Sequence, residues 1–425
     1  MKFITNIWNN LKEQPVLSGV SVTGTALAIF LIMVVVMLYE VKVVPFAPES
    51  NRERLLYADY GSIYSIKDGP DWNSNGGQSE ASLKKLYKGL ESAEAVSIYL
   101  AWLESAPASL PGQPSVSVDM RACDADFFKA FNYSFIHGVP FSESDFESGI
   151  KKAVITEGLA RKLFGRSDVV GEEIRLSRVP YVVSGVVKNV STLATKAYAD
   201  AWIPYSTTAQ AKQVWNTHMG SLSAVILAKE GVELAEVQEE CGRLFDKYND
   251  EIEPTGWKFI RRDRPYDQET EAVGPWANEK PDVGADRRER ITLLMILLLV
   301  PAINLSSMTH SRLRQRRSEI GVKRAFGATR MSIVRDILTE NMIVTLAAGV
   351  IGFLLSVAFA YLFSAELFTR SNLILANEPK IEMSILIHMS TFVWVLLFCF
   401  LLNVLSTGIP AWQAARVNVV NAIKG

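Results

Sequence analysis

Residues 312–335 read RLRQRRSEIGVKRAFGATRMSIVR, and this stretch lies between two long apolar runs of a 425-residue chain. Within it only Glu319 is acidic, with Asp336 just beyond its end. Its basic residues are Arg312, Arg314, Arg316, Arg317, Lys323, Arg324, Arg330 and Arg335. Short loops rich in Lys and Arg stay on the cytoplasmic side of a membrane during insertion. We therefore expect this segment in the cytoplasm, which fixes the predicted topology of the rest of the chain.

The same stretch contains a helical pattern that ends at Gly327. From Glu319 onward, Ile320 and Phe326 alternate with basic residues at a spacing typical of a helix, and Gly327 is placed to cap its C-terminus. One interpretation is a solvated basic linker that only sets the orientation of the chain. The other is a short docking helix that presents an apolar edge with basic flanks to a cytoplasmic partner.

The composition is that of a membrane protein with a large soluble part. Hydrophobic residues make up 49% of the chain, charged residues 21%, and the formal net charge is -1. A disordered chain is less apolar than this, and a nucleic-acid-binding chain carries a positive excess. Both classes are therefore excluded.

Four apolar runs are predicted to cross the membrane. Residues 18–39 carry no charge, and at 1.5 Å per residue a helix of this length reaches roughly 33 Å, enough for a bilayer. We expect this helix to remain as an anchor and not to be cleaved as a signal peptide, because its apolar core is long and no small-x-small cleavage site follows it. The other predicted spans are residues 286–309, 337–363 and 384–408.

Both termini are predicted to be cytoplasmic. The segments on that side are residues 1–17, 310–336 and 409–425, and those on the other side are residues 40–285 and 364–383. Phe3 and Trp8 would give the N-terminal segment a helix that lies on the membrane surface.

Two of the spans carry residues that predict contacts between helices. Pro301 and Asn304 interrupt the second span. We expect a kinked helix whose Asn304 hydrogen-bonds to a neighbouring helix, and the alternative is a kink that transmits motion. In the third span, small residues such as Gly349 and Gly352 would let another helix approach closely.

Residues 40–285 alternate short strand-like and helix-like runs, which predicts an α+β fold with mixed sheets, large enough for two subdomains. Strands are predicted at 153–156, 173–176, 181–187 and 201–204, and helices at 157–164 and 232–248. In the last helix Val237, Cys241, Leu244, Phe245 and Tyr248 are predicted to share one face. The predicted fold is a membrane protein of four transmembrane helices with a large α+β extracytoplasmic domain between helices one and two.

Residues for catalysis or for a cofactor do not form a recognisable pattern. The chain has no Gly-Lys dipeptide and hence no GxxxxGK[ST] phosphate loop, no GxSxG, and four histidines without metal-ligand spacing. We expect no enzyme activity and no cofactor on this chain. Cys123 and Cys241 could form a disulfide outside the cytoplasm, but two cysteines without motif spacing are more often free and buried.

The run 319–341, EIGVKRAFGATRMSIVRDILTEN, resembles the cytoplasmic signature of the MacB/FtsX family of ABC transporter permeases. The resemblance implies that this block engages an ATPase subunit. The residues it assigns to ATPase docking are Glu319, Ile320, Gly321, Val322, Lys323, Arg324, Phe326, Gly327, Ala328 and Thr329.

Two other regions resemble the same family. Residues 152–165 (KAVITEGLARKLFG), 170–176 (VGEEIRL) and 181–187 (YVVSGVV) are similar to the MacB-like periplasmic core domain, where they determine the fold. The tail 409–425 is similar to the family's C-terminal ending, except that Val419 stands where the family usually has proline.

The resemblance implies the permease subunit of a bacterial plasma-membrane ABC transporter. It implies a dimer of permeases, identical or paralogous, with two copies of a separate ATPase that holds ATP and Mg, and a periplasmic adaptor in some members. ATP-driven movement of the extracytoplasmic domain (mechanotransmission) would then export a peptide, an antibiotic or a lipophilic substrate. Two alternatives stay open: a regulator of a cell-wall hydrolase and a membrane receptor that works without an ATPase.

Overall fold

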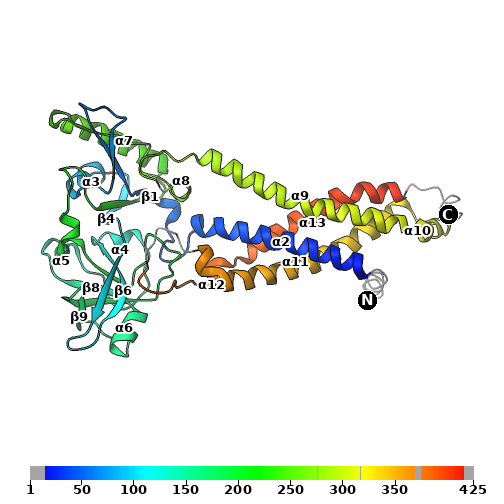
Figure 1. The fold of residues 1–425 in the computed structure, drawn as a ribbon, viewed down its shortest axis with the longest axis horizontal. Coiled ribbons are helices and arrows are strands. Elements are labelled where there is room, and N and C mark those ends of the chain that lie inside the picture. Colours follow the sequence, from blue (N-terminus) through cyan, green and yellow to red (C-terminus); the bar gives the residue numbers. More distant parts are fainter. Residues whose placement is uncertain (1–14, 275, 316, 369–374, 416–425) are drawn as a thin grey trace. The chain divides into compact units, whose positions relative to one another are not determined.

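The computed structural model describes residues 15–274, 276–315, 317–368 and 375–415. The chain divides into two units (Figure 1), which we describe separately. The helical unit comprises Met1–Glu40, Gly284–Leu367 and Met383–Gly425, and the soluble unit comprises Val41–Val283 and Phe368–Glu382. The predicted surface helix with Phe3 and Trp8 lies outside the described residues, as does the chain after Ala415.

The helical unit is built from long helices. They are α2 (Pro15–Val43), α9 (Val283–Gln315), α10 (Arg317–Ala325), α11 (Arg330–Phe368), α12 (Met383–Leu386) and α13 (Met389–Ala415). Three stretches of the described chain are long and apolar enough to cross a membrane: Gly19–Val43, Arg330–Ser364 and Met383–Gln413. The predicted second span, 286–309, lies within α9, which is not among the three, so a count of four membrane helices stays a prediction.

Small residues of α11 bring two other helices close, as the sequence predicts. A Cβ atom added to Gly352 would lie 2.6 Å from the backbone oxygen of Ala26 in α2, and one added to Gly349 would lie 2.7 Å from Leu396 in α13. Helix backbones can approach this closely only where side chains are very small. The side chain of Asn304 lies outside the described part of the chain, so its predicted hydrogen bond stays a prediction.

The soluble unit is built on a mixed ten-stranded sheet. Its strands are, in order, β1 (Leu55–Ala58), β12 (Leu222–Ala228), β4 (Ala93–Leu100), β6 (Val116–Cys123), β11 (Ala201–Pro204), β8 (Lys152–Thr156), β10 (Val179–Val187), β9 (Glu173–Leu176) and β5 (Glu104–Ser109), with β7 (Phe135–Gly138) on β10. Strand β5 also pairs with β6, so the six strands from β6 to β5 close into a ring. The pairs β11–β6 and β10–β8 are parallel and the others are antiparallel.

A second sheet and several helices complete this unit. The sheet has the order β13 (Trp257–Phe259), β2 (Gly61–Ser65) and β3 (Asn73–Gly76). The helices are α3 (Glu80–Tyr87), α4 (Phe127–Ala130), α5 (Glu143–Glu147), α6 (Glu157–Phe164), α7 (Leu234–Ile252) and α8 (Gln268–Val273), with 3-10 turns at Arg52–Arg54, Tyr205–Thr207, Gln210–Lys212 and Glu253–Thr255. The predicted α+β fold with mixed sheets is confirmed.

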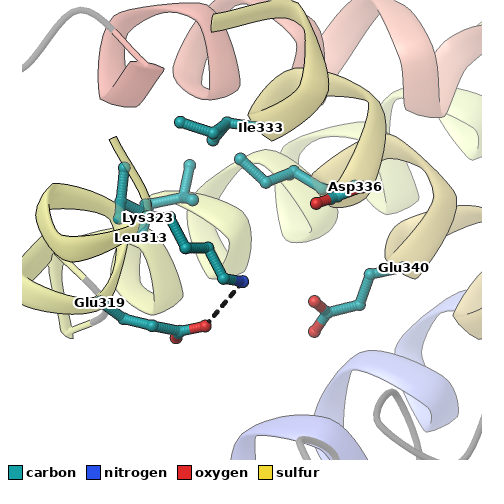
Figure 2. A pocket seen from close by; sticks show the side chains of 8 residues that line it. Leu313, Glu319, Lys323, Ile333, Asp336 and Glu340 are labelled. Carbon is teal, nitrogen blue, oxygen red and sulfur yellow. Dashed lines mark ion pairs between the residues drawn. The ribbon is translucent and has the colours of Figure 1, made fainter. Parts of the chain in front are cut away.

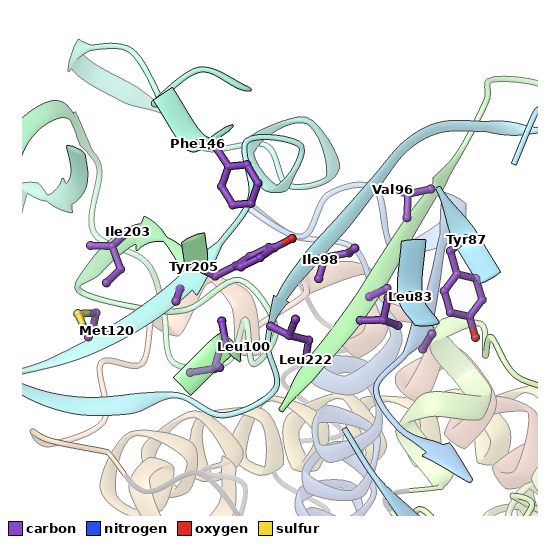
Figure 3. Close-up of a cluster of buried hydrophobic side chains, with 14 of the residues drawn as sticks. Leu83, Tyr87, Val96, Ile98, Leu100, Met120, Phe146, Ile203, Tyr205 and Leu222 are labelled. Atoms are coloured by element: carbon purple, nitrogen blue, oxygen red, sulfur yellow. The ribbon is translucent and has the colours of Figure 1, made fainter. Parts of the chain in front are cut away.

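Local signals fix α6 at the predicted residues. Thr156 accepts a hydrogen bond from the backbone N–H of Leu159 at its start, and Gly165 ends it at φ +71°, a conformation that glycine adopts without strain. On the predicted face of α7, Val237, Cys241, Phe245 and Tyr248 are buried, whereas Leu244 is half-buried. The buried residues of α7 belong to the same apolar cluster as the side chains drawn in Figure 3. In that cluster the ring centroids of Phe146 and Tyr205 lie 4.7 Å apart.

All three cysteines are free. Cys123 in β6, Cys241 in α7 and Cys399 in α13 are each buried without a disulfide. The open question about Cys123 and Cys241 is thus settled in favour of free, buried thiols. Burial raises the pKa of Cys241 to about 12, so this thiol is a packing residue and not a nucleophile.

The last turn of α2, which belongs to the soluble unit, is held by Arg52. Its Nη1 donates to the backbone oxygens of Val41 and Val44, at 2.8 Å each. Its Nε and Nη2 donate to Oε2 of Glu49, whose Oε1 accepts the backbone N–H groups of Lys196 and Ala197 at 2.9 and 3.0 Å. Helix ends leave unpaired carbonyls, and here a buried guanidinium pairs with them.

Candidate functional site

The predicted docking block forms helix α10 and the turn that follows it. Gly327 has φ +94°. Its N–H donates to the carbonyl of Arg324 at 3.1 Å, and the N–H of Ala328 donates to the carbonyl of Lys323 at 3.0 Å. These two bonds define a Schellman motif, in which a left-handed glycine ends a helix. The prediction that Gly327 caps this helix is confirmed.

Thr329 begins the next helix directly. Its Oγ1 accepts a hydrogen bond from the N–H of Ser332 at 3.2 Å, and its carbonyl accepts one from the N–H of Ile333 at 3.3 Å. Thr329 is therefore the N-cap of α11. One motif therefore ends α10 and the next residue starts α11, which leaves the chain little freedom between them. We call Phe326 to Thr329 the elbow.

Ile320 lies inside a small apolar cluster and not on the outer surface of α10. Its side chain is 8% exposed and packs with Leu313 of α9, Ile333 and Val334 of α11 and Ala411 of α13. The sequence assigned Ile320 to the apolar edge offered to a partner, and this part of the assignment needs correction. In the structure Ile320 fixes α10 to three other helices, because its apolar side chain is removed from water there.

The exposed apolar residues of the site lie at and beside the elbow. Phe326 is 89% exposed, Val322 is 43% exposed, and Met331, in the first turn of α11, is 64% exposed. Sequence reasoning missed Met331, although it lies only five residues after Phe326. A group of large apolar side chains left in contact with water marks an interaction surface when polar residues surround it.

Charged residues surround this apolar surface. Lys323 pairs with Glu319 one turn earlier, at 2.9 Å, and the exposed side chain of Arg330 opens α11. Arg324 and Ala328 are half-buried and Gly321 is buried. The ten predicted residues are thus contiguous in space along α10 and the elbow, but they divide into a packed side and an exposed side.

A pocket between α9, α10 and α11 is too small for a ligand. It encloses about 40 Å3 and is lined by Leu313, Glu319, Ile320, Lys323, Ile333, Asp336, Ile337 and Glu340. Figure 2 shows the Glu319–Lys323 ion pair, with the carboxylates of Asp336 and Glu340 nearby. Ligand pockets measure about 300 Å3 or more, and no group of His, Cys, Asp and Glu in the described chain could hold a metal ion. We therefore interpret it as a packing interface.

A buried polar network ties together the helices that carry α10. Asn341 of α11 donates through Nδ2 to Oγ1 of Thr309 in α9 at 3.0 Å. Asn403 of α13 donates through Nδ2 to Oγ1 of Thr345 at 2.5 Å and to the carbonyl of Asn341 at 3.2 Å. These four side chains are at most 5% exposed. Hydrogen bonds between helices in an apolar surrounding stabilise one particular packing of those helices.

Two family profiles match the chain. Residues 18–244 match the MacB-like periplasmic core domain, and residues 291–419 match the FtsX-like permease C-terminal region. The first match alone covers more than half of the 425 residues.

Curated relatives are similar over most of this chain. The macrolide export ATP-binding/permease protein MacB of Chromobacterium violaceum is 27% identical over 322 residues, which is 72% of this chain and 43% of that protein. The protein of the same name from Escherichia coli (strain K12) is 22% identical over 311 residues, which again is 72% of this chain and 43% of that protein. The chain thus spans less than half the length of these relatives.

A solved structure, the periplasmic region of MacB from Actinobacillus actinomycetemcomitans, aligns with 48% of this chain and 88% of its own at 13% identity and a TM-score of 0.33. The family assignment rests on the two profiles. They match a large α+β domain and a helical region with apolar helices long enough to cross a membrane. The chain is a multi-pass membrane protein that belongs to the MacB/FtsX family of ABC transporter permeases.

Proposed function

We propose that this chain is a transporter subunit that couples ATP hydrolysis by a separate ATPase to movement of its extracytoplasmic domain. The observation that carries the proposal is the elbow, where Phe326 is 89% exposed beside basic residues. A cytoplasmic ATPase with an apolar cleft and an acidic rim would complement this surface. ATP and Mg would bind to that ATPase, and this chain would hold no cofactor.

The packing of α10 suits the transmission of force. Ile320 links α10 to α9, α11 and α13 through one apolar cluster, and the capping residues Gly327 and Thr329 restrict the backbone of the elbow. A packed core deforms little, so a displacement of α10 would move the helices together and would not be absorbed locally. The Asn341 and Asn403 hydrogen bonds would keep those helices in register.

The remaining parts of the proposal come from the family. We infer that two permeases, identical or paralogous, assemble with two ATPases, and that both termini and the basic loop are cytoplasmic; a periplasmic adaptor joins the complex in some members of the family. Curated relatives carry the name macrolide export protein, and we propose that this chain exports a peptide, an antibiotic or a lipophilic substrate.

The test is purification of the tagged full chain in mild detergent, with mass spectrometry of the ATPases that accompany it. We expect one ABC ATPase subunit per permease, lost at least tenfold in Phe326→Asp. Val139→Asp is the matched control, since Val139 is 67% exposed on the soluble unit. Equal recovery of the ATPase with Phe326→Asp would overturn the docking role of the elbow. A chain that stays alone across several detergents would favour the receptor alternative, and capture of a cell-wall hydrolase would favour the regulator.

A further inference from the structure

Residues 375–382 belong to the soluble unit, although they lie in the sequence between α11 and α12. Leu375 packs against the apolar cluster that contains Trp202. The N–H of Ala376 donates to Oδ1 of Asp119 at 2.7 Å, and Nδ2 of Asn377 donates to the carbonyl of Ser117 at 2.9 Å. The segment is therefore held on strand β6 by apolar, backbone and side-chain contacts.

Lys380 makes the second group of contacts. Its Nζ lies 2.5 Å from Oδ1 of Asp200. Its carbonyl accepts hydrogen bonds from the N–H and hydroxyl of Thr192, at 2.9 and 3.2 Å, and from the hydroxyl of Ser191 at 3.1 Å. The N–H of Glu382 then donates to the same Ser191 hydroxyl at 3.4 Å.

The two aspartates that hold the segment, Asp119 and Asp200, are hydrogen-bonded to each other. The N–H of Asp200 donates to the carbonyl of Asp119 at 2.6 Å, and the N–H of Asp119 donates to Oδ2 of Asp200 at 3.2 Å. Asp119 is fully buried and Asp200 is 3% exposed. Adjacent buried carboxylates repel each other and lose hydration, so they need donors and a counter-charge.

Residues 375–382 supply both requirements. Burial raises the pKa of the Asp119 carboxyl, and the charge of Asp200 raises it further, whereas the Ala376 N–H, the Tyr198 hydroxyl and the Lys380 charge lower it. Removal of the segment would take away the ammonium group of Lys380 and one backbone donor. Loss of one partner of a buried charge is costly, which favours the seated segment.

We infer that residues 375–382 form a strap, seated on the positioning residues Asp119 and Asp200, through which α11 and α13 act on the soluble unit. The soluble unit is inserted in the sequence between α2 and α9, so without the strap only those two helices would lead into it. With the strap seated, the chain between α11 and α12 gives the soluble unit a third connection to the long helices, besides those through α2 and α9. The part of this inference that concerns coupling rests on the proposed function, and the seating of the strap does not.

The seating is tested by hydrogen–deuterium exchange of the full chain in detergent, without any ATPase. We expect Lys380→Met to speed exchange of residues 375–382 and of Thr192 at least tenfold, and Lys380→Arg to stay within twofold of wild type. Lys152→Met is the matched control. Lys152 pairs with Asp145 elsewhere in the soluble unit and is 36% exposed, close to the 40% of Lys380.

Asp200→Asn gives a second variant that should speed the same exchange, and combining it with Lys380→Met should add less than a further twofold. Protection of the strap within twofold of wild type in Lys380→Met would overturn the inference. An equal acceleration of exchange in β8 and in the strap would overturn the inference too. The ion pair would then stabilise the whole sheet and not the strap in particular.

The coupling is tested in the complex with the co-purified ATPase, trapped with ATP and vanadate. We expect the nucleotide-dependent change in exchange of β6 and β11 to fall at least twofold in Lys380→Met, with ATPase recovery unchanged. An unchanged response would overturn the coupling role while the seating result stands. Failure to recover any ATPase would overturn the proposed function and leave the seating measurement intact.

Discussion

The guanidinium of Arg52 donates to Oε2 of Glu49 at 2.9 Å from Nε and 2.6 Å from Nη2, and both side chains are at most 2% exposed. The phenyl ring of Phe46 covers the guanidinium at 4.2 Å. Arg52 also donates to the carbonyl of Val41 in the last turn of α2 and to that of Val44, the residue after the helix. One buried ion pair thus fixes the chain from Val41 to Arg52 within the soluble unit.

Arg52→Ala should lower the free energy of unfolding by about 3–5 kcal/mol, because it leaves Glu49 charged and buried without its partner. Urea unfolding of the full chain, followed by tryptophan fluorescence, would measure this. Arg161→Ala removes an ion pair with Glu157 in which Arg161 is 63% exposed, so it should cost less than about 1 kcal/mol. Equal losses in the two variants would contradict a special role for the buried pair.

Asp124 should make the soluble unit less stable as the pH rises from about 4 to about 6. Burial raises the pKa of its carboxyl from 3.8 to about 6, so between these values the folded state binds more protons than the unfolded state. Stability from this group is then present below pH 4 and lost as the pH passes the folded pKa. The charge of Lys88 and the hydrogen bond from the N–H of Ile98 lower the pKa of Asp124 and so offset part of the rise that burial causes.

Thermal unfolding of the full chain at pH 5 and pH 7 would test this point. The wild type should lose stability over that interval relative to Asp124→Asn, whose side chain does not titrate. A pH profile of the variant that follows the wild type would show that Asp124 is not the group responsible.

Gly352→Ala should destabilise the helical unit by about 1–3 kcal/mol, the usual cost of overpacking. The new methyl group would lie 2.6 Å from the backbone oxygen of Ala26 and 3.0 Å from Ile29, and backbone moves less readily than a side chain. Gly349→Ala meets the flexible end of Leu396 at 2.7 Å and should cost less. Thermal unfolding in detergent would rank the two, and the opposite order would contradict the packing of α2 against α11.

Ile320→Ala should lower stability by about 2–5 kcal/mol, since it empties a buried site among α9, α11 and α13. Phe326→Ala should leave stability unchanged because the ring is 89% exposed, and it should weaken ATPase recovery. Measuring unfolding and ATPase recovery for both variants separates the two roles. Full stability of Ile320→Ala would show that the cluster does not anchor α10.

Features that depend on neighbours in the sequence were predictable. Helix α6 from Glu157 to Phe164 has the bounds that capping signals indicate, and Gly327 caps the C-terminus of α10 as predicted. The length of the apolar runs predicted the three helices that are able to cross a membrane. The small residues of α11 predicted its close contacts with other helices. Each of these follows from backbone geometry or from side-chain type within a few residues.

The tertiary structure alone decided which residues of α10 are available to a partner. Ile320 and Phe326 are both large and apolar, so the sequence gives them the same role, yet one is 8% and the other 89% exposed. Ile320 is buried by residues of three other helices, among them Ala411 of α13, some ninety residues further along the chain. The strap contact of Lys380 with Asp200 and the bond between Asn341 and Asn403 also join distant positions. Such pairs leave no local pattern, because burial is set by whichever elements the fold brings together.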